Sequence, residues 1–191
     1  RNTTQKKPKS PTKNLSVAAH NFVVHELACR QYQIYCELFE IIKPRQNRKI
    51  LTPKTVTFDV VKDLTNKDQE IFYFFDDFAS VGLIQNQQTI VIRQLALTDI
   101  DIRRRAWAYL LNAFLALKHI NPTIYQAIKS SMPNEIAKEI FEDELTIANV
   151  LKELGLDRHH YDYQARLQQS KKPHALPLFV DLIAEEMQNE A

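Results

Sequence analysis

The chain has 191 residues, enough for one hydrophobic core and a small appendage. It contains only 2 glycines, and because β-rich folds use glycine at turns and bulges, the composition favours helices. Residues 1–14 carry five basic residues and no acid, which leaves 20 basic and 23 acidic residues elsewhere. The remaining chain is therefore net acidic, so any binding of a polyanion must come from residues 1–14 or from a local patch.

Residues 1–14 are polar, basic and proline-containing, with no side chains that could form a core. The sequence predicts a flexible basic arm here and a single helical domain over residues 15–191. A solvated tail is one interpretation of the arm. The other is a segment that becomes ordered on RNA, DNA or an acidic protein.

Residues 15–43 are predicted to form one long helix that ends before Pro44. Two lines of apolar side chains follow it. The first is a heptad-like seam of Val17, Val24, Leu27, Ile34, Leu38 and Ile41. The second line is the predicted partner-binding face, made of Phe22, Cys29, Tyr32, Cys36 and Phe39. A helix with two apolar faces is either enclosed by its own domain or offers one face to a partner.

The two cysteines, Cys29 and Cys36, are seven residues apart in this predicted helix. Their separation of roughly 10 Å along the axis exceeds the reach of a disulfide. We therefore expect free thiols and a reducing, intracellular compartment, either the cytoplasm or an organelle interior. No apolar run has the length of a membrane span, and no secretory signal is present. The first residue is arginine, so a targeting segment or anchor removed from a longer chain is compatible with the sequence.

A second basic cluster lies in the predicted loop at residues 43–54, which contains no acid. Together with the arm, it supports an alternative function in nucleic-acid binding. The candidate contact residues are Lys6, Lys7, Lys9, Lys13, Lys43, Arg45, Arg48, Lys49 and Lys54.

Residues 53–95 read as a strand, a helix and a strand, which is compatible with a winged-helix-like segment. The strands are expected at 55–61 and 88–94, and the helix at 65–81. That helix would carry Asp76, Asp77 and five aromatic residues, whereas a helix in a major groove needs donors for phosphates and base edges. A minor two-stranded ribbon is the simpler interpretation.

Residues 98–120 are predicted to form the central helix, with Thr98 as its N-cap. Ile100, Trp107, Leu111 and Phe114 fall on one line at helical spacing. Arg103 projects on the same side. We expect it to pair with Asp76 or Asp77, or alternatively to form an anion site with Arg104.

Shorter helices are predicted at 121–131, 133–141 and 142–154, with Gly155 ending the last in a left-handed conformation. The following helix, 157–169, carries His159, His160 and Asp162, whose spacing permits two ligands to one metal. Pro177 begins a final amphipathic helix. Its predicted inward residues are Phe179, Leu182, Ile183 and Met187.

These features predict a mainly α, single multi-helix domain of about six or seven helices, with a basic arm and an optional two-stranded ribbon. No catalytic motif or phosphate loop is present, and no cofactor is expected. We expect a non-enzymatic interaction or structural subunit that binds a protein partner or its own copies. The alternatives are a nucleic-acid-associated protein and a metal-dependent enzyme centred on His159, His160 and Asp162.

Overall fold

The computed structural model describes residues 12–42, 57–62, 70–81, 84, 88–117, 120–141 and 144–170. The strands are β1 (Thr12–Ser16), β2 (Asn21–Val24), β3 (Thr57–Lys62), β4 (Ile71–Phe74) and β5 (Thr89–Gln94). The helices are α1 (Cys29–Ile42), α2 (Phe78–Val81), α3 (Asp99–Ala116), α4 (Pro122–Ser131), α5 (Asn134–Phe141), α6 (Ile147–Leu154) and α7 (Arg158–Ser170).

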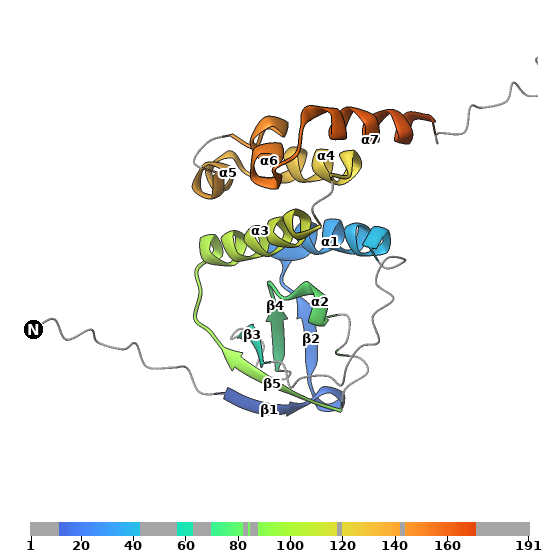
Figure 1. The fold of residues 1–191 in the computed structure, drawn as a ribbon. Helices are drawn as coiled ribbons and strands as arrows, with labels where there is room; N and C mark the ends of the chain where they lie inside the picture. The colour runs from blue at the N-terminus through green and yellow to red at the C-terminus, as the bar shows by residue number, and fades with distance from the viewer. Residues whose placement is uncertain are drawn as a thin grey trace, which may run out of the picture.

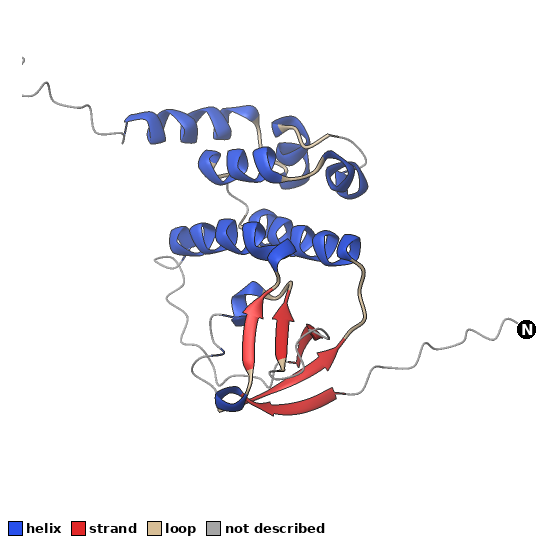
Figure 2. Ribbon diagram, turned by 180° about the vertical axis from the view of Figure 1, so that it is seen from behind, coloured by secondary structure: helices blue, strands red, loops and turns tan. Residues whose placement is uncertain are grey.

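These elements form three tiers, seen in the same order from the front and from behind (Figures 1 and 2). The sheet is the lowest tier. Helices α1 and α3 pack against each other above it, and α4 to α7 form the upper tier. Helix α4 contacts α1, and α5 and α6 contact α3, so the middle tier is covered on both sides.

The predicted fold class is wrong, because the chain forms a five-stranded mixed sheet and is an α/β protein. The strand order is β1-β5-β3-β4-β2. The pairs β1–β5 and β3–β4 are antiparallel, whereas β3–β5 and β2–β4 are parallel. Both strands of the expected ribbon exist. They are parallel neighbours within this sheet and not the two arms of a hairpin.

The helix predicted over residues 65–81 is wrong at residues 71–74, which form strand β4, and within the described residues only 78–81 are helical, as α2. Phe72 and Phe74 are buried in the sheet core, and Tyr73 between them is less buried. An apolar run of this length has no polar residues to reveal a period of two, so it does not distinguish a strand from a helix. Without this helix, the winged-helix alternative loses its recognition element.

The long helix predicted over residues 15–43 is also wrong in its first half. Strand β2 occupies residues 21–24, short 3-10 turns lie at 17–19 and 26–28, and α1 begins at Cys29. Phe22 therefore belongs to the sheet, where its ring stacks on Phe72 and Phe74 at centroid distances of 5.6 and 5.7 Å. The heptad-like spacing before residue 29 does not mark a helical seam. Val17 packs in the cluster on the sheet, whereas Val24 and Leu27 pack in the cluster between the helices.

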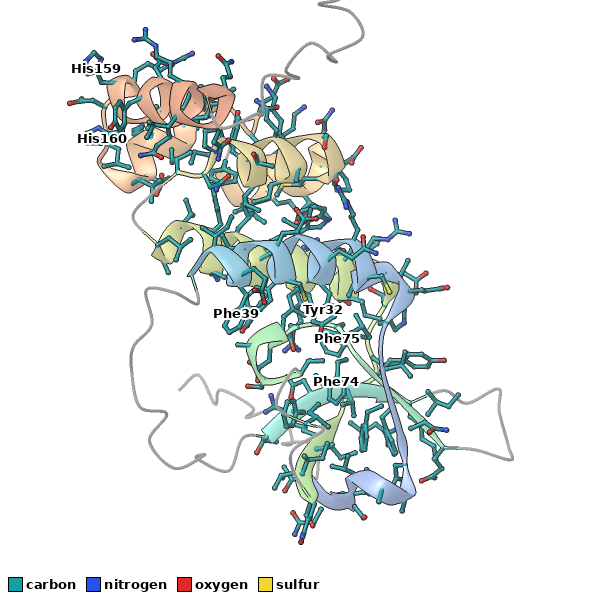
Figure 3. The ribbon with its side chains drawn as sticks, turned by 90° about the vertical axis from the view of Figure 1, so that its right-hand side faces the viewer. Tyr32, Phe39, Phe74, Phe75, His159 and His160 are labelled. Atoms are coloured by element: carbon teal, nitrogen blue, oxygen red, sulfur yellow. The ribbon has the colours of Figure 1, made fainter. Side chains whose placement is uncertain are left out.

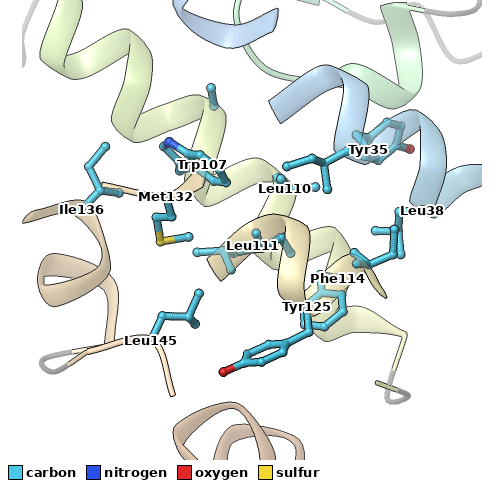
Figure 4. Close-up of a cluster of buried hydrophobic side chains, with 14 of the residues drawn as sticks. Tyr35, Leu38, Trp107, Leu110, Leu111, Phe114, Tyr125, Met132, Ile136 and Leu145 are labelled. Atoms are coloured by element: carbon cyan, nitrogen blue, oxygen red, sulfur yellow. The ribbon is translucent and has the colours of Figure 1, made fainter. Parts of the chain in front are cut away.

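Two hydrophobic clusters account for the core. One lies on the sheet and contains Phe58, Val60, Phe72, Phe74, Ile84, Ile90 and Ile92. The larger cluster fills the space between the helices, with side chains of α3 at its centre (Figure 4). Trp107, Leu110, Leu111 and Phe114 are each at most 2% exposed, which confirms the central role predicted for this helix.

The structure confirms two predicted helix ends, at Thr98 and Gly155, whereas α6 begins at Ile147 and not at residue 142 as predicted. Thr98 accepts from the backbone N–H of Asp101, and the Asp101 carboxylate accepts from that of Thr98, so the two form a capping box. Gly155 adopts φ +63°, and the N–H of Leu156 donates to the carbonyl of Leu151 at 2.9 Å. Glycine takes this left-handed conformation without the steric penalty of a Cβ atom.

An ion-pair cluster joins the sheet to α3. Asp59 of β3 is 7% exposed and accepts two hydrogen bonds from Arg93 of β5, at 2.7 and 2.8 Å. Arg105 of α3 donates to Asp59 at 2.7 Å and to Asp76, after β4, at 2.9 Å. The Arg105 guanidinium also lies 4.8 Å from the centre of the buried Phe75 ring. Arg105, and not Arg103 as predicted, is the arginine that pairs with Asp76.

The two carboxyl groups of this cluster respond oppositely to their surroundings. Burial acts to raise the pKa of Asp59, but hydrogen bonds and charge from Arg93 and Arg105 outweigh it and lower the pKa. Burial raises the pKa of Asp76, and Arg105 offsets this only in part. Ionised Asp59 therefore stabilises the fold, whereas the ionisation of Asp76 has a net cost.

These shifts predict how stability depends on pH. The contribution of Asp59 is complete above its unfolded-state pKa of about 3.9 and is lost as the pH falls through its lower folded-state pKa. Asp76 has the opposite sign, because acidification through its raised pKa removes a cost. The free energies of unfolding of the wild type and Asp59→Asn should differ by a constant amount near neutral pH, where Asp59 and Asp76 are both ionised, and that difference should change once the pH falls into the range where these two carboxyl groups titrate. Urea unfolding at a series of pH values measures the difference; a gap independent of pH would contradict a charged Asp59.

Two further sequence expectations meet the structure only in part. Residues 12–14 of the predicted arm belong to β1, which pairs with β5, whereas residues 1–11 and the final amphipathic helix lie outside the described residues. Within the described ranges, no helix combines the length and the apolar character needed to cross a bilayer.

Candidate interaction surface

A groove of about 190 Å³ lies between α1 and α2, and we call it the α1–α2 groove. Its lining residues are Tyr32, Tyr35, Cys36, Phe39, Glu40, Phe78 and Ala79. Figure 3 shows Tyr32 and Phe39 on the side of α1 that faces α2. The groove thus has aromatic walls and is open to solvent along the exposed side chains of α1.

Aromatic contacts hold the walls of the groove in place. The Phe78 ring makes edge contacts with Tyr32 at 5.6 Å and Tyr109 at 5.2 Å. Tyr35 lies 5.8 Å from both Phe78 and Tyr109 and stacks with Phe39 at 6.3 Å. Tyr35 and Phe78 are buried, whereas Phe39 is 37% exposed. Such packing restricts the rotamers of the rings, so a ligand would meet a largely preformed surface.

The position of α2 depends on a strained turn. Asp77 has φ +50°, a conformation that aspartate adopts more readily than most residues but still at a cost. Its carbonyl accepts from the N–H groups of Ser80 and Val81. The Tyr109 hydroxyl accepts from the N–H of Ala79 at 3.2 Å and donates to the Asp77 carboxylate at 3.4 Å. Burial raises the pKa of Tyr109, which keeps this hydroxyl protonated.

A second pocket of about 310 Å³ adjoins the groove, and Tyr32 lines both. Its lining residues are Phe22, Val23, Val24, Tyr32, Phe74, Val81 and Ile84. Strand β2 forms one wall and is the last strand of the sheet on this side. Val23 is 49% exposed. The apolar surface therefore continues from α1 to the sheet edge.

The groove also carries negative charge. The Glu40 side chain lines it, and Asp77 lies next to its floor residue Phe78. The Asp77 charge reaches the groove wall, because together with burial it raises the pKa of Tyr35. An apolar site bordered by carboxylates favours ligands that combine an apolar group with a cation.

The structure brings three of the five predicted partner-binding residues together, namely Tyr32, Cys36 and Phe39. Phe22 lines the adjoining pocket from β2, and Cys29 is exposed outside both. Both cysteines are free thiols, as predicted. Sequence reasoning missed the other four lining residues, Tyr35, Glu40, Phe78 and Ala79, and also Tyr109, which holds α2 in place. Only Tyr35 and Glu40 had a usable signal, because they lie three and eight residues from Tyr32 on the same helix.

A pocket of about 320 Å³ lies along α7, far from the sheet (Figure 3). It is lined by His159, His160, Asp162, Tyr163 and Arg166. In the part of the chain that the structure describes, no group of three or more histidine, cysteine or acidic side chains is placed to hold one ion. Asp162 instead pairs with Arg158 at 3.4 Å. The metal alternative gains no geometric support from this pocket.

Most of the basic residues predicted to bind nucleic acid lie outside the described residues. Lys13 lies exposed on β1, and the other eight fall outside the described residues, so that alternative stays a prediction. The anion site suggested for Arg103 and Arg104 does not form as expected, because Arg104 makes a double hydrogen bond with Glu139 at 2.6 and 2.9 Å. No family model, curated protein or solved structure matched this chain.

Proposed function

We propose that this chain is a non-enzymatic subunit that binds a protein partner through the α1–α2 groove. The ligand is a partner segment that inserts an aromatic or long aliphatic side chain and carries lysine or arginine beside it. One observation supports this most directly: Phe39 and Val23, both large and apolar, are exposed at the two ends of a continuous aromatic surface. A contiguous exposed apolar patch on a folded domain is typical of interaction sites.

The size and chemistry of the groove favour a protein segment over a small metabolite. The groove of about 190 Å³ continues into the adjoining pocket of about 310 Å³, so the apolar surface is extended and open, and not one enclosed small-molecule site. The walls of the groove are four aromatic rings with the Cys36 thiol and the Ala79 methyl, and its polar groups are the hydroxyls of Tyr32 and Tyr35 and the carboxylate of Glu40. Such walls hold one apolar side chain well. Buried aromatic anchors of this kind carry much of the energy of protein–protein binding.

The charge around the groove also restricts which partner segments can bind. The Asp77 charge reaches Tyr35 in the groove wall, so an acidic segment would be repelled and a segment with lysine or arginine attracted. Val23 and the adjoining pocket extend the contact for a longer segment. We therefore expect an apolar anchor with basic neighbours, and not an acidic amphipathic helix, to bind best.

Selection of a displayed random peptide library on the purified protein tests this proposal. We expect the enriched peptides to share an aromatic or aliphatic anchor next to lysine or arginine. Phe39→Asp should weaken their binding at least tenfold, because it removes apolar contact and adds like charge beside Glu40. Fluorescence anisotropy of labelled peptides measures the change.

Gln33→Asp is the matched control, since Gln33 is an exposed residue of α1 that does not line the groove. It adds the same charge and should leave the affinity unchanged. Both variants must retain the wild-type circular dichroism and unfolding midpoint. The proposal is wrong if the enriched peptides bind Phe39→Asp with the same affinity as the wild type. If the wild type self-associates and Phe39→Asp is monomeric, a second copy of the chain is the ligand of the groove.

A further inference from the structure

Strand β2 lies beside β4 at one edge of the sheet (Figure 1), where it borders the pocket of about 310 Å³ that adjoins the α1–α2 groove. Phe22, Val23 and Val24 all line this pocket. Side chains of successive strand residues point to opposite faces of a sheet, so three in a row share a pocket where it runs along the edge of the strand. The pocket therefore reaches the backbone of β2 and is not confined to one face of the sheet.

The pairing of β2 with β4 shows which of its backbone groups point away from the sheet. The N–H of His25, the residue after β2, donates to the carbonyl of Phe74 in β4 at 2.7 Å. The backbone groups of a strand alternate in direction with a period of two. Val23 therefore also faces β4, whereas the N–H and carbonyl groups of Phe22 and Val24 point outward, along the pocket.

Within the described residues, these outward groups have little to bond to. The Cys29 sulfur lies 3.8 Å from the Val24 carbonyl oxygen, and a thiol is a weak donor. No hydrogen bond between described residues reaches the N–H of Val24 or either backbone group of Phe22. Such a row of donors and acceptors is the template on which a further strand can pair.

The side chains of β2 do not oppose such pairing. Edge strands that must stay single commonly carry lysine, proline or another charge. The opposite edge of the sheet, β1, reads TKNLS and exposes Lys13. Strand β2 reads NFVV, with neither charge nor proline, and its Val23 is about half exposed. Of the two edges, β2 is the one suited to pair with another chain.

We propose that the partner segment binds as an added strand along β2, in an extended conformation. The inference rests on the proposed function and deepens it, because it names the conformation of the segment. Its main chain pairs with Phe22 and Val24, and its apolar anchor continues into the α1–α2 groove. Tyr32 lines both the groove and the pocket, so one segment reaches both. In such complexes main-chain hydrogen bonds supply affinity and alternate side chains supply specificity. A helical segment is excluded, because its main-chain groups are bonded within the helix.

Residue-resolved hydrogen exchange by NMR tests the added strand, with the tightest-binding peptide from the displayed library as the probe. In the free protein we expect fast exchange at the outward N–H groups of Phe22 and Val24. Saturating peptide should slow both at least tenfold, because each then donates to the peptide. The N–H of His25 is already bonded to β4, so its exchange should change much less.

Val24→Pro removes one outward donor without removing a hydrogen bond to β4, and it should weaken peptide binding at least tenfold. Asn14→Pro is the matched control at the opposite edge. Asn14 is exposed on β1, and its N–H points away from β5, because the N–H of Val17 donates to Gln88 and direction alternates along the strand. This variant should bind the peptide as the wild type does.

N-methylation of single peptide amides covers the case in which Val24→Pro unfolds the protein. In an added strand, alternate amides of the peptide face β2, so methylation should weaken binding at every second position. Equal effects at successive positions would contradict an extended conformation.

The remaining outcomes separate this inference from the proposed function. The inference is wrong if peptide binding depends on Phe39 while exchange at Phe22 and Val24 stays unchanged; binding at the groove then stands. Slower exchange at both amides with a peptide that is insensitive to Phe39→Asp keeps the added strand and rejects the groove. Protection of both amides without peptide, lost on hundredfold dilution, identifies a second copy of the chain as the added strand and overturns the inference. A library that yields no binding peptide overturns both proposals.

Discussion

Replacement of Arg105 by alanine is expected to lower the free energy of unfolding by about 3–5 kcal/mol, the usual effect of removing one partner from a buried ion pair. The side chains of its partners, Asp59 and Asp76, are only 6% and 15% exposed. Arg93 still pairs with Asp59 in the variant, but Asp76 loses its cation and stays in a site that already disfavours its charge. The contact with Phe75 is lost as well.

Arg104→Ala is the control for this prediction. Arg104 is the preceding residue of α3, and its side chain is 43% exposed, against 37% for Arg105. Its partner Glu139 is 47% exposed, so water screens the pair and its loss should cost much less than the loss of Arg105. Urea unfolding followed by circular dichroism measures both variants. Equal losses in the two would show that burial of the carboxylates does not govern the strength of these pairs.

The second large effect is expected for Trp107→Ala, which should lower the free energy of unfolding by about 3–5 kcal/mol. Trp107 is 2% exposed and lies among Leu110, Leu111 and Met132 in the helical core (Figure 4). Its removal leaves a cavity between the middle and upper tiers, because helices on both sides of α3 limit any collapse. Thermal and urea unfolding measure the loss.

Ile100→Ala is the control in the same helix. The sequence spacing predicted that Ile100 lies on the same face of the helix as Trp107. Ile100 is 65% exposed, so its truncation should change the free energy of unfolding by no more than about 0.5 kcal/mol. A large loss at Ile100 would mean that the start of α3 is covered by another element. A small loss at Trp107 would mean that the core is loosely packed.

Much of the helical half of this protein was predictable from local signals. Thr98, Asn121 and Gly155 mark helix boundaries through hydrogen bonds made within a few residues, and such signals do not depend on the rest of the fold. The apolar face of α3 was predictable for the same reason, except at Ile100. Ile100 is exposed although Ile102 in the same turn is buried, and a periodic pattern does not reveal where the elements that cover one side of a helix end.

The sheet was underestimated because its strands lack the alternation that a half-exposed sheet shows. Strand β4 reads IFYF, with aromatic residues on both sides of the strand. Strand β2 has only four residues, and at seven-residue spacing Val17 and Val24 imitate a helical seam. The low glycine content also misled, because these strands are joined through longer segments and not through tight glycine turns.

One wall of the candidate site was predictable from the sequence, and the other was not. Tyr32, Cys36 and Phe39 were found from their spacing, because all three lie on one face of α1. The opposite wall, Phe78 and Ala79, is 38 or more positions further along the chain and depends on the turn at Asp77 and the hydroxyl of Tyr109. No local pattern predicts that α2 packs there.

By itself, the sequence determined the helix boundaries at Thr98, Asn121 and Gly155, most of the central side chains of α3, and that both thiols stay unpaired. Those properties follow from hydrogen bonds and side-chain spacing within one or two helical turns. Only the tertiary structure decided that five short strands between residues 12 and 94 form one sheet, that Arg105 joins it to α3, and that α1 and α2 enclose a groove. These depend on contacts between residues tens of positions apart, where burial and charge pairing outweigh local propensity.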